Sequence, residues 1–168
     1  AGAVGHMWRT TSDICAPGRA DWDRAIRIAF ANDKLADFAG PGRWNDPDMM
    51  VVGMPGLTEA RNRSLFSLWC MMSAPLMAGN DLRDMSPSTA GILANLEAIG
   101  VDQDPLGVQG RVVWNDGNVS LWAGKPLFDG SLAVLVLYLG KHRADRRVFW
   151  EELGFSAADE LYVRNIWT

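Results

Sequence analysis

Two short acidic stretches contain the residue types that could do chemistry. The first is WRTTSDI at residues 8–14, and the second is WNDPDM at residues 44–49. Both place aspartates among aromatic and small residues, where a strand that served only a core would carry valine or leucine. Two carboxylates are the minimum for glycoside hydrolysis, because one protonates the leaving oxygen while the other attacks the anomeric carbon or activates water. The two stretches are therefore candidates for one shared site.

Asp13 and Arg9, in the first stretch, each allow a catalytic and a structural interpretation. An aspartate just after a strand is more often a helix cap or a turn former than a proton donor. A proton donor must also stay protonated, through partial desolvation by Trp8 and Ile14 or through a nearby negative charge. A planar guanidinium four residues earlier can hold a sugar hydroxyl while it pairs with a carboxylate, or it can form a structural ion pair.

Asp46 and Asp48, in the second stretch, flank a proline that stiffens their loop and makes it an extended or turned segment. Residues two apart on an extended chain face the same way, so both carboxylates could point into one site. Together with Asn45 they also suit calcium or magnesium, but one short cluster supplies too few ligands, and we predict no metal. Trp44 could either stack on a sugar face or fill the rim of the site.

The elements that would position these residues alternate between strands and helices over the first 100 residues. We expect strands within residues 6–14, 44–52 and 75–78. Alternation of this kind predicts the α/β class, with a parallel sheet and helices outside it. In a parallel barrel, catalytic groups lie at the C-terminal ends of the strands, where both acidic stretches fall. Periodicity alone leaves a closed barrel and an open sheet as alternatives.

Three helices are expected after polar caps at Asp21, Thr58 and Ser86, the last followed by a proline that suits the first helical position. Gly100 is a suitable residue just past the end of the third helix. Apolar residues at helical spacing define the expected core faces. These faces are Trp22, Ile26, Ala29 and Phe30 in the first helix, Leu65, Leu68, Trp69 and Met72 in the second, and Ile92, Leu93, Leu96 and Ile99 in the third.

Antiparallel strands are expected after residue 107. Residues 111–114 and 119–122 flank an Asp-Gly turn, which is typical of a hairpin. We therefore divide the chain into residues 1–107 and residues 108–168. The further strands expected in the second part lie at residues 132–139, 147–150 and 162–167.

The composition excludes several classes of function. The 168 residues are 48% hydrophobic and 21% charged, which is typical of a globular protein. With a net charge of −4, nothing indicates a nucleic-acid partner, and no apolar run is long enough to cross a membrane. Cys15 and Cys70 lack metal-ligand spacing, and Cys70 lies in an apolar run where a buried thiol is expected.

The two acidic stretches resemble the melibiases of glycoside hydrolase family 27. The resemblance continues through residues 74–76 (APL), 80–83 (NDLR) and 102–107 (DQDPLG). It implies the last three βα units of a (β/α)8 TIM barrel at residues 1–107, followed by a partial antiparallel β-sandwich at residues 108–168. The chain would then be the C-terminal part of a longer protein, secreted or periplasmic, with no cofactor.

The resemblance also implies an activity and the residues that carry it. It indicates a retaining exo-glycosidase that hydrolyses terminal α-D-galactosyl residues of a galactoside or oligosaccharide. Asp13 matches the position of the acid/base, and Arg9, Asp48 and Met49 match sugar-binding positions. Asp46 would be structural, as would Asp81 and Asp104, which fall in the other shared motifs.

Two departures from the family pattern leave alternatives open. The family nucleophile lies in a Lys-Tyr-Asp-like motif that this sequence lacks, so we expect the isolated chain to be inactive. Gly5 stands where some members carry a cysteine, so that disulfide is not possible. The alternatives are a related specificity (α-N-acetylgalactosaminidase, β-L-arabinopyranosidase or isomalto-dextranase) or a non-catalytic carbohydrate-binding or structural fragment. The oligomeric state stays open.

Overall fold

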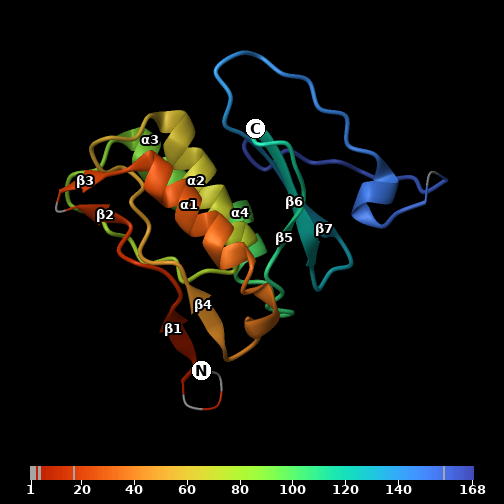
Figure 1. Ribbon diagram of the computed structural model, residues 1–168, viewed down its shortest axis with the longest axis horizontal. Coiled ribbons are helices and arrows are strands. Elements are labelled where there is room, and N and C mark those ends of the chain that lie inside the picture. Colours follow the sequence, from red (N-terminus) through yellow and green to blue (C-terminus); the bar gives the residue numbers. More distant parts are fainter. Residues whose placement is uncertain (1–2, 4, 17, 157) are drawn as a thin grey trace.

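The fold is taken from a computed structural model, which describes residue 3 and residues 5–16, 18–156 and 158–168. Helices and short strands form the N-terminal part, and a three-stranded antiparallel sheet packs beside the helices (Figure 1). Residues from both parts share one hydrophobic core, in which Trp122 and Leu137 of the sheet join the buried side chains of the helices.

The strands that end at the acidic stretches are parallel neighbours. Strand β1 (Met7–Arg9) pairs with β4 (Trp44–Asp46), with Arg9 opposite Asp46, and Met50 forms a parallel bridge with Ala78. All three segments are shorter than predicted, and residues 75–78 contribute only this bridge. Asp48 ends the extended run after β4, because its φ of +100° does not fit a strand.

Helices α1 (Trp22–Asp33) and α2 (Glu59–Met71) begin at the predicted caps. The Asp21 carboxylate accepts the N–H of Arg24 at 3.1 Å, and the Thr58 hydroxyl accepts the N–H of Arg61 at 3.3 Å. In α2 the predicted core face is confirmed. In α1 the buried face differs from the predicted one and includes the polar residue Asn32. The fully buried residues of α2 include Leu65, Leu68 and Trp69, with Met72 at its end, whereas α1 buries Ala25, Ile28, Ala29 and Asn32.

The single helix predicted after Ser86 is wrong. The structure has two helices, α3 (Pro87–Leu93) and α4 (Leu96–Asp102), and Gly100 lies inside the second. Asn95 separates them because its side chain accepts the N–H of Ala98 at 3.0 Å and so acts as a new N-cap.

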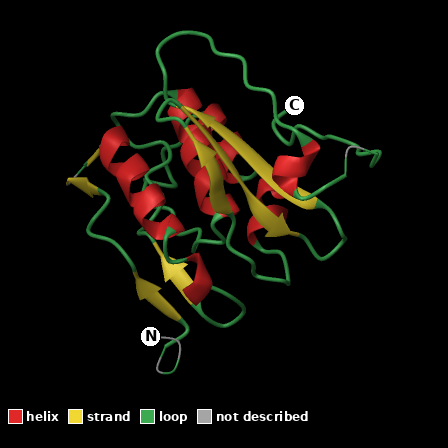
Figure 2. Cartoon of the chain, turned by 45° about the vertical axis from the view of Figure 1, so that its right-hand side comes forward, coloured by secondary structure: helices red, strands yellow, loops and turns green. Residues whose placement is uncertain are grey.

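The predicted hairpin is confirmed. Strands β5 (Arg111–Asn115), β6 (Val119–Pro126) and β7 (Leu132–Tyr138) form an antiparallel sheet in that order (Figure 2). Gly117 has a φ of +94°, which the turn between β5 and β6 requires. A second, short hairpin of β2 (Cys15–Ala16) and β3 (Arg19–Ala20) leads into α1.

The strands predicted at residues 147–150 and 162–167 are wrong. The first segment runs into a short 3-10 helix, η2 (Trp150–Leu153), and a similar turn, η1 (Ala36–Phe38), follows α1. The end of the second segment contacts helix α2, where the Trp167 indole donates to Ser67 at 3.1 Å, while Tyr162 and Val163 are exposed. Among the described helices, none has the length and apolar character that a membrane span requires.

A buried lysine joins the sheet to the helical part. Lys125 of β6 is fully buried, and its ammonium donates to the Ser73 hydroxyl and, at 2.7 Å, to the Val108 carbonyl. Burial lowers the pKa of Lys125 to about 8, against the attraction of Asp102. Burial likewise raises the pKa of the Asp102 carboxyl to about 7, against the hydrogen bond from Gln103 at 2.6 Å.

We predict that the substitution Asp102→Asn changes how the free energy of unfolding depends on pH. Because the pKa of Asp102 rises from 3.8 to about 7 on folding, the native state loses stability as the pH rises through this window. Lys125, whose pKa falls from 10.5 to about 8, adds stability only as the pH rises through that higher window. The variant should therefore gain stability relative to the parent as the pH rises from about 4 to about 7, the range between the two pKa values.

Urea unfolding midpoints across this pH range measure the effect. Asp81→Asn is the matched control, because the hydrogen bonds from Arg83 lower the pKa of Asp81, so its titration falls below the window. Parallel stability curves for the parent and the Asp102 variant would contradict the prediction.

Candidate active site

The Arg9 guanidinium lies between two aspartates. Its Nη2 donates to Asp13 Oδ1 at 3.3 Å and to Asp48 Oδ2 at 3.0 Å, and it also donates to the Thr11 carbonyl at 3.2 Å. Asp13 follows β1 and Asp48 follows β4, so the parallel pairing of these strands brings the two carboxylates to one edge. We call Arg9, Asp13 and Asp48 the Arg9 cluster.

The two aspartates of the cluster lie in different environments. The Asp48 side chain is 12% exposed, and its Oδ2 and Oδ1 accept the backbone N–H groups of Ile14 and Met49, both at 2.7 Å. The Asp13 side chain is 83% exposed. Asp48 is therefore fixed, whereas Asp13 is free to reach a bound molecule.

The predicted desolvation of Asp13 by its neighbours is not observed. Ile14 is fully buried and points into the core, so Asp13, the residue before it, is directed outward. Among the described residues, Asp13 forms an ion pair with Arg9.

Asp46 and Asp48 do not face the same way. Of the two predicted conformations, extended or turned, the segment is turned, because the φ of Asp48 is +100°. The Asp46 carboxylate accepts the backbone N–H of Asp48, two residues later in the chain, at 2.8 Å, and Asp46 is 8% exposed. Asp46 thus shapes the loop that carries Asp48.

Hydrogen bonds from Thr10 and Thr11 connect the two acidic loops. Thr10 donates its backbone N–H to the Asp46 carbonyl at 2.8 Å, and the Thr11 hydroxyl donates to the Pro47 carbonyl at 2.9 Å. The Thr10 hydroxyl also donates to Asn32 of α1 at 2.7 Å. Asn32 was not predicted from the sequence, although a polar residue on the apolar side of a helix is a usable signal.

Met49 is half-buried and packs against Gly79, which directly follows Ala78, the residue that forms the parallel bridge with Met50. A Cβ added to Gly79 would lie 2.6 Å from Met49 Sδ and 2.9 Å from the Met50 carbonyl oxygen. Only glycine fits there without movement of the backbone that carries Met49. Gly107 is packed in the same way against the half-buried Trp44, because a Cβ added to Gly107 would lie 2.8 Å from the Trp44 ring.

The other acidic residues of the shared motifs make local contacts. Asp81 pairs with Arg83 at 2.7 Å, and Asp104 accepts the N–H groups of Leu106 and Phe128 at 3.0 and 2.9 Å.

Burial raises the pKa of the Cys70 thiol well above its usual range, so this cysteine is held protonated.

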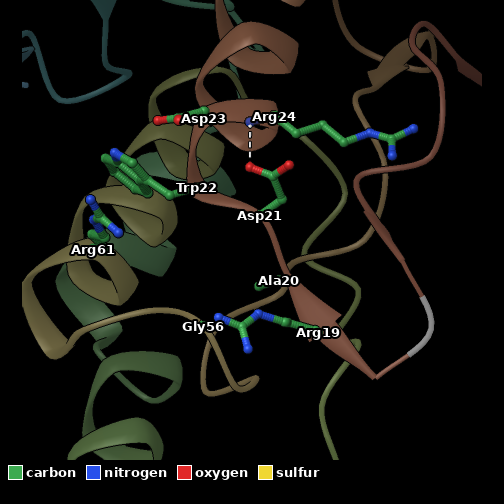
Figure 3. Close-up of a pocket in the computed structure, with 8 residues that line it drawn as sticks. All are labelled: Arg19, Ala20, Asp21, Trp22, Asp23, Arg24, Gly56 and Arg61. Carbon is green, nitrogen blue, oxygen red and sulfur yellow. Dashed lines mark hydrogen bonds between the residues drawn. The ribbon is translucent and has the colours of Figure 1, made fainter.

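A separate pocket of about 440 Å³ lies where α1 begins, and residues 19–24, Gly56 and Arg61 line it (Figure 3). The Arg61 guanidinium covers the Trp22 ring, 5.3 Å from its centroid, as the close-up shows. This contact holds the start of α1 against α2. None of the Arg9 cluster lines the pocket.

Aspartates at the ends of adjacent parallel strands are an arrangement that glycoside hydrolases use. Residues 2–104 match the family Melibiase_2, described as alpha galactosidase A. The chain belongs to this melibiase family, glycoside hydrolase family 27.

Relatives agree with this assignment. Alpha-galactosidase 2 of Arabidopsis thaliana is 41% identical over 99% of this chain and 41% of its own length. Alpha-N-acetylgalactosaminidase of Gallus gallus is 44% identical over 70% of this chain and 29% of its own length. The chain thus spans about two fifths of the first of these relatives.

A solved structure shares the fold. The family 27 β-L-arabinopyranosidase of Geobacillus stearothermophilus superposes with a TM-score of 0.79 and 26% identity, over 89% of this chain and 36% of that protein. Structural neighbours of this family combine a TIM barrel with a β domain.

We predict that Gly79→Ala destabilises the protein by about 1–3 kcal/mol, the usual penalty for overpacking. The added methyl group must displace Met49 and the Met50 carbonyl. Gly91→Ala is the control: this exposed position in α3 has nothing within 4 Å of an added Cβ, so alanine should stabilise by about 0.5–1 kcal/mol. Urea unfolding measures both, and equal effects would contradict the packing argument.

Proposed function

We propose that this chain is part of a retaining exo-glycosidase that hydrolyses terminal α-D-galactosyl residues. The observation that carries the proposal is the Arg9 guanidinium bonded to both Asp13 and Asp48 at the ends of adjacent parallel strands. The substrate is a galactoside or an oligosaccharide that ends in galactose. Membership of a family that includes alpha-galactosidases supports this choice.

Asp13 is proposed as the acid/base. It would protonate the leaving glycosidic oxygen while a nucleophilic carboxylate attacks the anomeric carbon and forms a glycosyl-enzyme. In the second step it would take a proton from the water that releases the sugar. Its high exposure supports the role, because the group must reach a substrate atom. The nucleophile would come from a segment outside this chain.

Arg9, Asp48 and Met49 are proposed to hold the sugar. A carboxylate offers about four acceptor sites, and Asp48 uses three of them for Arg9, Ile14 and Met49. One site is left for a sugar hydroxyl. The contacts of Arg9 described above all use Nη2, so the N–H groups on Nε and Nη1 can donate to further hydroxyls.

We also propose that residues 1–107 form the last three βα units of a (β/α)8 barrel and that residues 108–168 form part of an antiparallel β-sandwich. Support comes from the parallel pairing of β1 with β4 and the parallel bridge between Met50 and Ala78. The antiparallel order β5-β6-β7 supports the second part.

A related specificity is the alternative within the same chemistry, because relatives include an alpha-N-acetylgalactosaminidase and a β-L-arabinopyranosidase. The protein made from the complete reading frame should be assayed with the aryl α-galactoside, the aryl α-N-acetylgalactosaminide and the aryl β-L-arabinopyranoside. We expect the highest kcat/KM with the first. Sugar binding without hydrolysis of any of the three would favour the binding-module alternative instead.

We predict that Asp13→Asn in this protein lowers kcat by about 10²–10⁴-fold, the usual contribution of general acid–base catalysis. Asp145→Asn is a matched control, because the Asp145 side chain is 87% exposed, compared with 83% for Asp13, and pairs with Arg143 away from the cluster.

NMR of the first sugar anomer released by the parent should show the α-anomer, as retention requires. A first-formed β-anomer would exclude the two-step mechanism.

We further predict that the isolated 168-residue chain does not hydrolyse an aryl α-galactoside. The reason is that the proposed mechanism needs a second carboxylate as nucleophile, and the family motif for it is missing from this sequence. The assay is release of the aryl alcohol by the purified chain. Release that disappears with Asp13→Asn would show that the chain contains its own nucleophile.

A further inference from the structure

Asp48 has a backbone conformation that most residues avoid. Its φ of +100° lies in the region that favours glycine, and a conformation of this kind persists only where the surroundings hold it. The conformation matters for the site, because the direction of the Asp48 carboxylate depends on it. The structure must therefore contain groups that fix this backbone.

Two hydrogen bonds fix the two peptide groups of Asp48. On one side, the Asp46 carboxylate accepts the Asp48 N–H at 2.8 Å. On the other side, the indole N–H of Trp69 donates to the Asp48 carbonyl at 2.9 Å. Trp69 is fully buried in α2, so its ring is held by the core and its N–H points at a defined place.

The fixed backbone in turn places the carboxylate. Asp48 Oδ2 accepts from Arg9 and from the backbone N–H of Ile14, the residue directly after Asp13. A change of φ toward an ordinary value would swing this carboxylate away from both donors. Arg9 would then lose one of its two carboxylates, and the peptide next to Asp13 would lose its acceptor.

We propose that Trp69 is a positioning residue for the Arg9 cluster. Its indole N–H holds the Asp48 carbonyl, keeps Asp48 in its strained conformation and so directs the Asp48 carboxylate to Arg9 and to the loop of Asp13. Trp69 touches no substrate, and its effect passes through Asp48. The effect on catalysis rests on the proposed function, whereas the effect on the Asp48 carboxylate does not.

Trp122 provides a matched control, because it is an equally buried tryptophan with an indole hydrogen bond elsewhere. Its N–H donates to the Ser120 hydroxyl at 3.0 Å, and its ring packs against Phe30 with centroids 5.4 Å apart. Trp69→Phe and Trp122→Phe each remove one indole and one buried hydrogen bond. Both should lower the urea midpoint to a similar degree.

The first measurement is amide hydrogen exchange, which does not depend on activity. In the protein from the complete reading frame, Trp69→Phe should speed exchange at the Ile14 and Met49 amides roughly tenfold, because the Asp48 carboxylate that accepts from them is no longer held. After correction for global stability, Trp122→Phe should leave both amides unchanged. Equal protection of these amides in the two variants would overturn the proposal.

The second measurement is kinetic, with the aryl glycoside that the parent hydrolyses. Trp69→Phe should raise KM and the inhibition constant of the released sugar roughly tenfold, with a smaller change in kcat, while Trp122→Phe stays within about twofold. A parent that hydrolyses nothing would refute the proposed function, and the exchange result would still decide the role of Trp69.

If Trp69→Phe does not fold, the benzothienyl analogue of tryptophan at position 69 keeps the ring size and removes only the N–H. Loss of protection at Ile14 and Met49 in this variant supports the proposal. Full protection in it overturns the proposal, because the ring alone would then suffice.

Discussion

The carboxylate of Asp48 is the group on which the site depends. A carboxylate that is 12% exposed is unfavourable unless hydrogen bonds replace the lost water. Asp48 meets this requirement with two backbone N–H groups and the guanidinium of Arg9. Because Arg9 ends β1, Ile14 lies in the loop after β1 and Met49 lies in the loop after β4, satisfying one carboxylate fixes the two loops relative to each other.

The rest of the fold supports this arrangement from behind. Helix α1 contributes Asn32, which accepts from Thr10 at the start of the first loop, and Gln109 donates to the Asn32 carbonyl at 3.0 Å. Helix α2 contributes Trp69, and the buried Lys125 joins its C-terminal end to the antiparallel sheet. The sheet is thus connected to the site through packed helices.

Local signals in the sequence were reliable where the interaction itself is local. The caps Asp21 and Thr58 and the Asp-Gly turn were predicted because each satisfies backbone groups within a few residues. Asn95 was missed because the apolar spacing around it continues unbroken, while its side chain competes for the backbone. Residues 162–167 have strand-like composition, yet the end of this segment is bound to the helices, by Asn95 at the Ile166 carbonyl and by Ser67 at the Trp167 indole.

The sequence by itself determined the alternating elements, the two acidic stretches and the resemblance to the melibiases, all of which are patterns of residue type and spacing. Only the tertiary structure decided that Arg9 bonds to Asp48, that Asp48 has a positive φ and that Asp13 is exposed. The reason is physical: Arg9 and Asp48 are 39 residues apart, and the parallel pairing of β1 with β4 brings them together. The conformation of Asp48 depends in addition on a tryptophan 21 residues further along the chain.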